Sequence, residues 1–382
     1  MPQPELPVPI ELLDEDRLAL ASGQPEATVL GVLRVAARIG ASDVHLRAER
    51  VPLFRVEGEL RPLGQVVLSA EIVAQAAVAL AEGSGVELER LRAMQLDFSC
   101  VISSVGRFRA HMYRQAGTIA LVLHRVPDPI PSFAALRLPP VMKRIALAQG
   151  GLVLVVGATA TGKSTTIAAM LEYVNQTASK HIVTIEAPVE FAFQDHLASF
   201  SQREVGRDVE SFEQGLSGAL REDPDVAFVG ELQTRAAFDL ALNAAESGRT
   251  VVSTCYAKDA ARTVFRLVNF YPADQRESIR SRLADSLVAI VGQRLVPRKG
   301  ARSRVLCTEV LMSSSTIRDC IRDPNRARGL TAALDAGTLE LGTHSFDQML
   351  VSMVRDGVVT LEAAQAAATS PSDLSRAVKN LR

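Results

Sequence analysis

The chain has 382 residues, of which 47% are hydrophobic and 22% are charged, and its formal net charge is -1. This length exceeds what one hydrophobic core usually serves, so we expect two folded domains with tails. The balance of apolar and charged residues excludes wholesale disorder. Because the net charge is close to zero, there is no global basic field, and we predict no nucleic-acid partner.

The cysteines and the amino terminus indicate the compartment. Cys100, Cys255, Cys307 and Cys320 stand alone instead of in CxxC pairs, which disfavours both a zinc site and a disulfide framework. The chain starts with prolines and acidic residues where a secretory signal needs a basic start and an apolar core. No apolar run is long enough to span a bilayer, so we expect a cytoplasmic protein with reduced thiols.

The first third of the sequence predicts a small α+β domain. Residues 1–25 lack steady periodicity and are assigned to a tail, with an accessory helix as the alternative. Beyond them, segments with apolar residues at helical spacing are interspersed with short extended segments typical of an antiparallel sheet. The predicted helices are 28–39, 69–82 and 88–94, and the predicted strands are 43–46, 53–56, 59–60, 97–102, 106–114 and 118–126. We place this domain at 26–126.

A proline-rich segment predicts the domain boundary. Residues 127–131 read PDPIP, with three prolines in five residues, so they cannot lie inside a helix and indicate a stiff linker over 127–135. The following segments alternate short β-branched runs with helical patterns, which is typical of a parallel sheet with crossover helices. The predicted strands are 151–156, 181–185, 226–229 and 250–254.

The rest of the chain predicts helices. From residue 273 onward helical patterns dominate, including 345–356 and 361–369, and the last residues are polar. We therefore expect an α/β domain with C-terminal helices over 136–368 and a tail over 369–382.

The strongest chemical signal is the segment 157–164, GATATGKS, which matches GxxxxGK[ST] between a buried strand and a helical run. Glycines at both ends let backbone N–H groups surround a phosphate, and the helix N-terminus adds a favourable dipole. Lys163 would reach the β- and γ-phosphates of ATP, and the Ser164 hydroxyl would bind Mg²⁺. A simple glycine-rich turn is the alternative, which the matching flanks disfavour. The predicted phosphate site comprises Gly157, Ala158, Thr159, Ala160, Thr161, Gly162, Lys163, Ser164 and Thr165.

An ATPase also needs a carboxylate that orients or deprotonates the attacking water. Glu231 is the candidate because it ends the apolar run 226–230, so that it would lie at a strand tip beside the phosphate loop. The alternative is an ordinary surface glutamate after a strand. Glu186 and Glu190 also follow a predicted strand, and either is a candidate for a second carboxylate.

These motifs and several others resemble the PilT/PilU-type ATPases that retract type IV pili. The likeness runs from about residue 26 to 370 and keeps the family order over both domains. The matching segments are 40–46 (GASDVHL), 54–58 (FRVEG), 106–109 (GRFR), 157–164, 184–191 (TIEAPVEF), 201–206 (SQREVG), 219–225 (ALREDPD), 229–231 (VGE) and 293–298 (QRLVPR). The last segment favours PilU. The paired cysteine motifs usual in PilB-type extension ATPases are absent, which favours retraction.

The resemblance implies a PAS-like first domain, a RecA-like second domain and a hexameric ring with ATP between the domains. It implies that Glu190 and Glu231 are the catalytic glutamates and that Lys163 and Ser164 act in the P-loop. It further implies ATP and Mg²⁺ as cofactors, a PilT-type paralogue and an inner-membrane pilus platform protein as partners, and a cytoplasmic location, peripheral at the inner membrane. The implied process is twitching motility.

The sequence departs from the family pattern around the expected active site. Ala187 stands where the family has Asp, and Gln233-Thr234 replaces an Arg-Asp pair. Arg249 and Tyr256 stand at the two positions of the family's histidine box. Tyr256 can donate a hydrogen bond but cannot titrate near neutral pH as His does.

The arginines of the first domain are altered as well. Gly117 and His124 stand at two positions where PilT has Arg. Arg109, Arg114 and Arg125 lie close enough in sequence to substitute, and we include Arg109 and Arg125 among the predicted nucleotide-binding residues. The alternative for each is a solvated strand arginine.

Two functions therefore remain open. The leading one is a hexameric ATP-hydrolysing motor subunit that powers type IV pilus retraction. The alternative is an ATP-binding, weakly hydrolysing accessory subunit, PilU-like, that works with a complete PilT-type paralogue. The retained Lys163, Ser164 and both glutamates favour the first. The second is favoured by the substituted positions Ala187, Gln233, Arg249 and Tyr256. A small-molecule kinase is disfavoured because no second substrate pocket is indicated.

Overall fold

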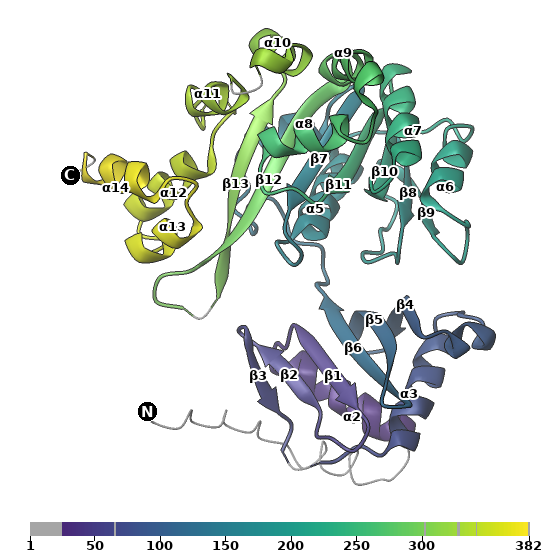
Figure 1. The fold of residues 1–382 in the computed structure, drawn as a ribbon. Helices are drawn as coiled ribbons and strands as arrows, with labels where there is room; N and C mark the ends of the chain where they lie inside the picture. The colour runs from purple at the N-terminus through teal and green to yellow at the C-terminus, as the bar shows by residue number, and fades with distance from the viewer. Residues whose placement is uncertain (1–24, 65, 302, 327–328, 341, 381–382) are drawn as a thin grey trace. The chain divides into compact units, whose positions relative to one another are not determined.

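The computed structural model describes residues 25–382, apart from residues 65, 302, 327–328, 341 and 381–382 (Figure 1). The chain divides into two compact units. The first contains the described residues up to Pro129 together with the segment Ala187–Phe191. The second contains Ile130–Glu186 and the described residues from Ala192 onward. The break between Pro129 and Ile130 falls inside the predicted linker. The predicted tail at 1–25 lies almost entirely outside the described residues.

The first unit is built on a six-stranded sheet with the order β3-β2-β1-β6-β5-β4, in which every neighbouring pair is antiparallel. The antiparallel α+β prediction is confirmed. Its helices are α2 (Pro25–Arg38), α3 (Ala70–Glu82) and the short 3₁₀ helix η1 (Leu88–Arg92), and its strands are β1 (Asp43–Arg47), β2 (Leu53–Val56), β3 (Glu59–Pro62), β4 (Gln95–Ile102), β5 (Gly106–Gln115) and β6 (Thr118–Val126).

One face of this sheet is apolar and the other is polar. Side chains alternate along each strand, so Phe108 and Met112 of β5 pack with Leu33 of α2 and Val73 of α3 in one core. Arg107, Arg109 and His111, which alternate with the buried residues of β5, point to the opposite face of the sheet. That face presents charged side chains, among them Arg109.

The second unit is built on a seven-stranded sheet with the order β13-β12-β7-β11-β10-β8-β9. Neighbouring strands are parallel except for β12 and β13, which pair antiparallel. The bounds are β7 (Gly151–Gly157), β8 (His181–Glu186), β9 (Ser199–Glu204), β10 (Val226–Glu231), β11 (Thr250–Cys255), β12 (Leu287–Pro297) and β13 (Arg304–Met312). The central strand β7 is buried along its whole length, as expected of a parallel strand covered on both faces.

Helices cover both faces of this sheet (Figure 1). Residues of α4 and α5 form one core with β7, and residues of α7, α8 and α9 form another on the opposite face. The α/β prediction is confirmed. The helices are α4 (Val141–Ala146), α5 (Lys163–Thr177), α6 (Phe212–Ala219), α7 (Arg235–Glu246), α8 (Ala260–Val268), η2 (Ala273–Gln275), α9 (Arg276–Ser286), α10 (Ser315–Arg322), η3 (Pro324–Arg326), α11 (Gly329–Asp335), α12 (Phe346–Arg355), α13 (Leu361–Ala367) and α14 (Pro371–Lys379).

Helices dominate after residue 273, as predicted, but two long strands in this part of the chain were not predicted. Strands β12 and β13 contain 11 and 9 residues, and most of their side chains are buried. A strand that is buried on both faces has no alternating pattern, so its apolar run cannot be told from a buried helix by periodicity. Strand β9 was likewise not predicted, because its side chains are mostly polar and half-buried.

The C-terminal helices form a separate small core on β12 and β13. Leu350 of α12 and Leu374 of α14 are buried in it with Cys307 of β13. Helix α14 lies where the sequence analysis placed a tail, and its first turn has Pro371 at a favourable position. The proposed domain bounds themselves stay predictions.

The cysteines and the helices can be compared with the expectations of reduced thiols and of no membrane-spanning segment. All four cysteines are free and buried, and burial raises the pKa of the Cys100 and Cys307 thiols to about 12, so both are protonated and unreactive. None of the helices in the described part of the chain combines the length and the apolar composition that a bilayer crossing needs.

Candidate nucleotide-binding site

The predicted phosphate loop joins β7 to α5, as the motif requires. Gly157 ends the strand in close contact with its surroundings: a Cβ atom there would lie 2.7 Å from the Gln293 carbonyl oxygen and 2.7 Å from Thr161 Oγ1. Gly162 precedes α5 in the left-handed region with φ of 87°, which favours glycine. Both glycines are therefore needed to bring backbone N–H groups around a ligand at the start of α5.

Lys163 is the first residue of α5 and folds back over the loop. Its Nζ donates hydrogen bonds to the carbonyl oxygens of Gly157, at 3.1 Å, and Ala158, at 2.8 Å. The same ammonium lies 4.8 Å from the centre of the Tyr256 ring, which is a cation–π distance. A phosphate that binds the loop must draw Lys163 away from these partners.

The next residues anchor the loop to the sheet. Ser164 and Thr165 are half-buried in the first turn of α5, and Thr166 is buried behind them. Gln293 of β12 donates from Nε2 to Thr166 Oγ1 at 2.6 Å. Gln293 belongs to a segment that resembles the PilT/PilU family, but it is not among the predicted site residues. No sequence signal marks it, because strand β12 was not predicted.

Glu231 lies at the same edge of the sheet as the loop. It ends β10 and pairs in register with Thr254 of β11, which in turn pairs with Val155 of β7. The carboxyl ends of these parallel strands meet at one edge, where ligands bind in open α/β sheets. Gln233 donates from Nε2 to Glu231 Oε2 at 2.8 Å, so a neutral amide contacts this carboxylate.

The two residues at the histidine-box positions lie at opposite ends of β11. Tyr256 directly follows the strand at the P-loop edge, whereas Arg249 precedes it and its carbonyl oxygen accepts a hydrogen bond from Gly151 N, at the start of β7. Six strand residues separate the two positions, which corresponds to about 20 Å. Arg249 therefore lies at the opposite edge of the sheet from Tyr256 and the P-loop.

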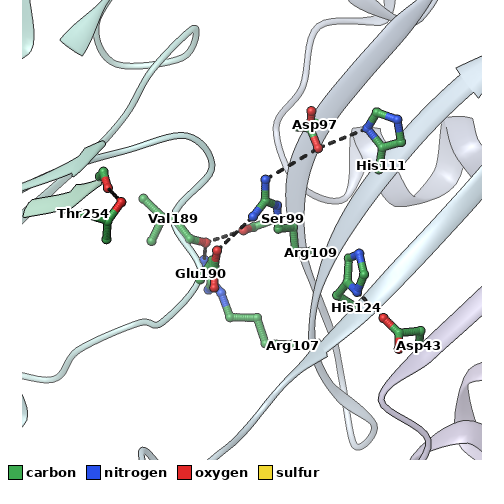
Figure 2. A network of polar contacts seen from close by, with 11 residues as sticks. Asp43, Asp97, Ser99, Arg107, Arg109, His111, His124, Val189, Glu190 and Thr254 are labelled. Atoms are coloured by element: carbon green, nitrogen blue, oxygen red, sulfur yellow. Dashed lines mark hydrogen bonds and ion pairs between the residues drawn. The ribbon is translucent and has the colours of Figure 1, made fainter. Parts of the chain in front are cut away.

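The two candidate glutamates after β8 have different surroundings. Glu186 ends β8 in the second unit, where it is buried and accepts a hydrogen bond from Thr184 Oγ1 at 2.7 Å. Glu190 belongs to the first unit, where Arg109 Nη1 donates to its Oε1 at 2.9 Å (Figure 2). Glu190 and Glu231 therefore lie in different units.

Three side chains on the polar face of the first sheet hold the segment Ala187–Phe191. Ser99 Oγ and Arg107 Nη2 both donate to the carbonyl oxygen of Val189, the latter at 2.9 Å, and Arg109 contacts Glu190 as described. These contacts explain why the segment belongs to the first unit, although the sequence analysis assigned it to the second domain. Figure 2 shows the three donors side by side on β4 and β5.

Comparisons with known proteins agree on one family. The profile of the type II/IV secretion system proteins matches residues 137–360, more than half of the chain. The twitching motility protein of Neisseria gonorrhoeae is 36% identical over 324 residues, 85% of this chain and 86% of the relative. The crystal structure of the pilus retraction motor PilT with bound ADP is 37% identical, has a TM-score of 0.80, and the match covers 91% of this chain and 99% of that one.

The chain belongs to the type II/IV secretion system protein family, in its PilT/PilU group. The type IV pilus ATPase PilU of Pseudomonas aeruginosa is 35% identical over 353 residues, 91% of this chain and 90% of the relative. The type IV pilus retraction ATPase PilT of the same organism is 35% identical over 341 residues, 89% of this chain and 98% of the relative. As a PilT/PilU-type protein the chain is a nucleotide-binding ATPase, while the predicted leaning towards PilU finds no support in these equal identities.

The first-domain arginines proposed for a PilT/PilU-type site do not lie together. In the β5–β6 pair, Arg109 is opposite His124, whereas Arg125 is opposite Phe108, whose side chain is in the core. Residues directly opposite each other share a face, so Arg109 and Arg125 lie on opposite faces of the sheet. Arg114 is opposite Ile119 and shares the face of Arg125. Of the three arginines expected to substitute for the missing ones, Arg109 therefore lies on one face with the candidate catalytic residue Glu190, and Arg114 and Arg125 lie on the other face.

The described residues contain no group of three or more His, Cys, Asp or Glu side chains that would hold a metal on its own. This fits the way Mg²⁺ binds in nucleotide sites, where the ion keeps several waters and takes few protein ligands besides phosphate oxygens. The hydroxyl of Ser164 at the start of α5 is a suitable donor of this kind.

Proposed function

We propose that this chain is a subunit of an ATP-hydrolysing motor that retracts type IV pili. The observation that carries the proposal is the P-loop between β7 and α5, with Lys163 in its first helical turn and Glu231 at the neighbouring strand ends. Membership of the PilT/PilU group supports the same function. The chain would then turn the closure of successive sites in a ring into work on the pilus base.

The residue roles are part of this proposal. Gly157 to Thr165 would hold the phosphates, with Lys163 on the β- and γ-phosphates. Glu231 would orient the attacking water, because it lies at the P-loop edge of the sheet, where the neutral Gln233 amide contacts its carboxylate. Glu190 would be the second catalytic carboxylate, and Arg109 would accompany it. Mg²⁺ would be held by Ser164 and phosphate oxygens, where it would neutralise charge that develops on the transferred group.

We propose further that the chain works as a hexamer in the cytoplasm, at the inner membrane, where it engages a pilus platform protein. Closed rings are common among homo-oligomers, and a ring lets one subunit complete the site of the next. A PilT-type paralogue would be an additional partner.

A second candidate is an accessory subunit that binds ATP but hydrolyses it slowly. Two contacts favour it. Tyr256 lies over the Lys163 ammonium, and Gln233, a neutral side chain, contacts Glu231. Neither residue supplies the charge that its family counterpart would bring, so the transition state would gain less stabilisation than the bound nucleotide.

The test compares steady-state ATP hydrolysis by the wild type and by Glu231→Gln. Gln has the shape of Glu but no charge, so we expect k_cat to fall by about 10²-fold or more while ATP affinity stays within about threefold. Asp285→Asn, an exposed carboxylate on α9 outside the site, is the matched control and should hydrolyse ATP as the wild type does. Equal turnover by the wild type and Glu231→Gln would overturn the assignment of Glu231.

A further inference from the structure

A buried carboxylate of β13 lies in the same row of the sheet as the end of β11. Glu309 pairs with Gly292 of β12, which pairs with Val156 of β7. Val156 in turn pairs with Cys255, the last residue of β11, and Tyr256 follows directly. Glu309 therefore lies level with the turn after β11, although β12 and β7 separate its strand from β11.

The carboxylate of Glu309 holds the start of helix α8. The side chain is buried, and its Oε1 accepts a hydrogen bond from Ala260 N at 2.8 Å. Ala260 is the first residue of α8, which packs against β12 and β13 (Figure 1). Negative charge is favourable at a helix N-terminus, so the contact suits both partners and ties the first turn of α8 to β13.

The burial of this carboxylate is costly. Burial raises the pKa of Glu309 to about 7, while the backbone N–H groups of Ala260 and Phe346, the first residues of α8 and α12, lower it. An apolar side chain of similar volume would fill the same space without this cost. What the carboxylate supplies, and an apolar side chain does not, is a hydrogen-bond acceptor for the backbone of these helices.

The turn between β11 and α8 places an aromatic ring at the P-loop. The turn comprises residues 256–259, and the centre of the Tyr256 ring lies 4.8 Å from the Lys163 ammonium. Because the turn is short, the position of Ala260 at its far end restricts where the ring can lie. A shift of Ala260 would therefore move the Tyr256 ring relative to Lys163.

We propose that Glu309 is a positioning residue of the nucleotide site. By holding Ala260 it fixes the turn 256–259 and, through this turn, the Tyr256 ring over Lys163. The inference rests on the proposed function, because it gives the position of the ring a consequence for ATP turnover. ATP affinity depends mainly on the P-loop, whereas turnover also depends on how the side chains at this edge of the sheet are arranged. Loss of the Glu309 contact should therefore lower the turnover rate more than it changes ATP affinity.

The first experiment places a fluorescent probe at the position of the ring. The chain contains no Trp, so Tyr256→Trp gives the full chain a single tryptophan emission. Acrylamide quenching of this emission is measured for Tyr256→Trp alone and in combination with Glu309→Gln or Glu309→Met. Gln keeps an oxygen that accepts from Ala260 N, whereas Met has a similar size and lacks this oxygen. We expect Gln to leave the quenching constant unchanged and Met to raise it about twofold or more.

The second experiment measures ATP turnover with Tyr256 in place. We expect Glu309→Gln to keep the wild-type turnover rate. Glu309→Met should lower the turnover rate about fivefold or more, with ATP affinity changed by less than about threefold. Glu362→Met, at a fully exposed carboxylate of α13, is the matched control and should leave both the quenching constant and the turnover rate unchanged.

A further variant removes the donor instead of the acceptor. Ala260→Pro lacks the backbone N–H, and proline is well tolerated at the first position of a helix. Asp259 before it has ψ of 171°, an extended conformation that suits the residue before a proline. Ala260→Pro should act as Glu309→Met does, and thermal unfolding of both variants shows whether they fold.

Three results would overturn the inference. The first is unchanged quenching in a folded Glu309→Met or Ala260→Pro, and the second is equal loss of turnover in Glu309→Gln and Glu309→Met. The third is raised quenching with a wild-type turnover rate, since the position of the ring would then have no effect on the reaction. Failure of the proposed function would be seen instead as wild-type ATP hydrolysis by Lys163→Ala and Glu231→Gln, and the quenching experiment does not depend on hydrolysis.

Discussion

The P-loop and the polar face of the first sheet are built on different principles. The P-loop depends on backbone groups that two glycines expose at the start of α5, and its sequence keeps every position of the motif. The polar face depends on the side chains of Ser99, Arg107 and Arg109. Gly117 and His124 stand at two positions where the resemblance implies arginine. A site built from backbone N–H groups is retained when neighbouring residues are substituted, whereas a site built from particular side chains is lost when those side chains change. We therefore expect nucleotide binding and turnover to separate in this protein.

The largest effect should come from the one side chain on which the P-loop depends. Lys163→Ala removes the ammonium that meets the β- and γ-phosphates, and the loop itself offers no other cation. We expect ATP affinity to fall by about 10²-fold or more, measured with a fluorescent ATP analogue. Lys299→Ala, an exposed lysine beyond β12, serves as the control. Unchanged affinity in Lys163→Ala would mean that the nucleotide does not bind at the P-loop.

A substitution on the polar face of the first sheet should lower the turnover rate and leave ATP affinity nearly unchanged. Arg109→Ala removes the partner of Glu190 and the one candidate arginine on that face, so we expect k_cat to fall by about tenfold or more. ATP affinity should change by less than about threefold. Arg125→Ala is the matched variant from the opposite face and should retain wild-type k_cat. If the two variants lost equal activity, the assignment of Arg109 alone to the site would be wrong.

A buried carboxylate away from both regions gives a prediction about stability. Burial raises the pKa of Glu309 to about 7, above its ordinary value of 4.5, while Ala260 N donates to its Oε1 at 2.8 Å. The folded chain therefore holds the proton more tightly than the unfolded chain does. The contribution of Glu309 to the free energy of unfolding is therefore fully present below pH 4.5. It is lost as the pH rises through 7.

Glu309→Gln cannot ionise and keeps an oxygen that accepts from Ala260 N. The thermal unfolding temperature of Glu309→Gln should match that of the wild type at pH 5 and exceed it by several degrees at pH 8. This difference corresponds to about 1–3 kcal/mol in the free energy of unfolding. Glu362→Gln, at a fully exposed carboxylate on α13, should show no such difference between the two pH values. A constant offset between wild type and Glu309→Gln from pH 5 to 8 would contradict the burial argument.

Local patterns predicted the parts of the fold and site that depend on local sequence. The P-loop, its flanking strand and the position of Glu231 follow from a contiguous motif and from strand order along the chain. Strands β12 and β13 were missed because burial on both faces removes their period. Gln293 was missed with them, since its role comes from pairing β12 beside β7.

Other errors came from contacts between residues distant in sequence. Arg109 and Arg125 were grouped by their proximity along the chain, but the β5–β6 register places them on opposite faces. Arg249 and Tyr256 were grouped by a family motif, yet one strand separates them. The segment Ala187–Phe191 was placed in the predicted second domain, but side chains of β4 and β5 hold it. Register and distant contacts are not visible in a single sequence.

The most direct test of the separation between binding and turnover uses Tyr256. Tyr256→His restores a group that titrates near neutral pH and removes the ring that lies over Lys163. ATP affinity and k_cat would be measured for the wild type, for this variant and for PilT of Pseudomonas aeruginosa under the same conditions. We predict similar ATP affinity for all three, a wild-type k_cat below that of PilT, and a several-fold rise in k_cat in Tyr256→His. A wild-type k_cat equal to that of PilT, unchanged in the variant, would contradict the account.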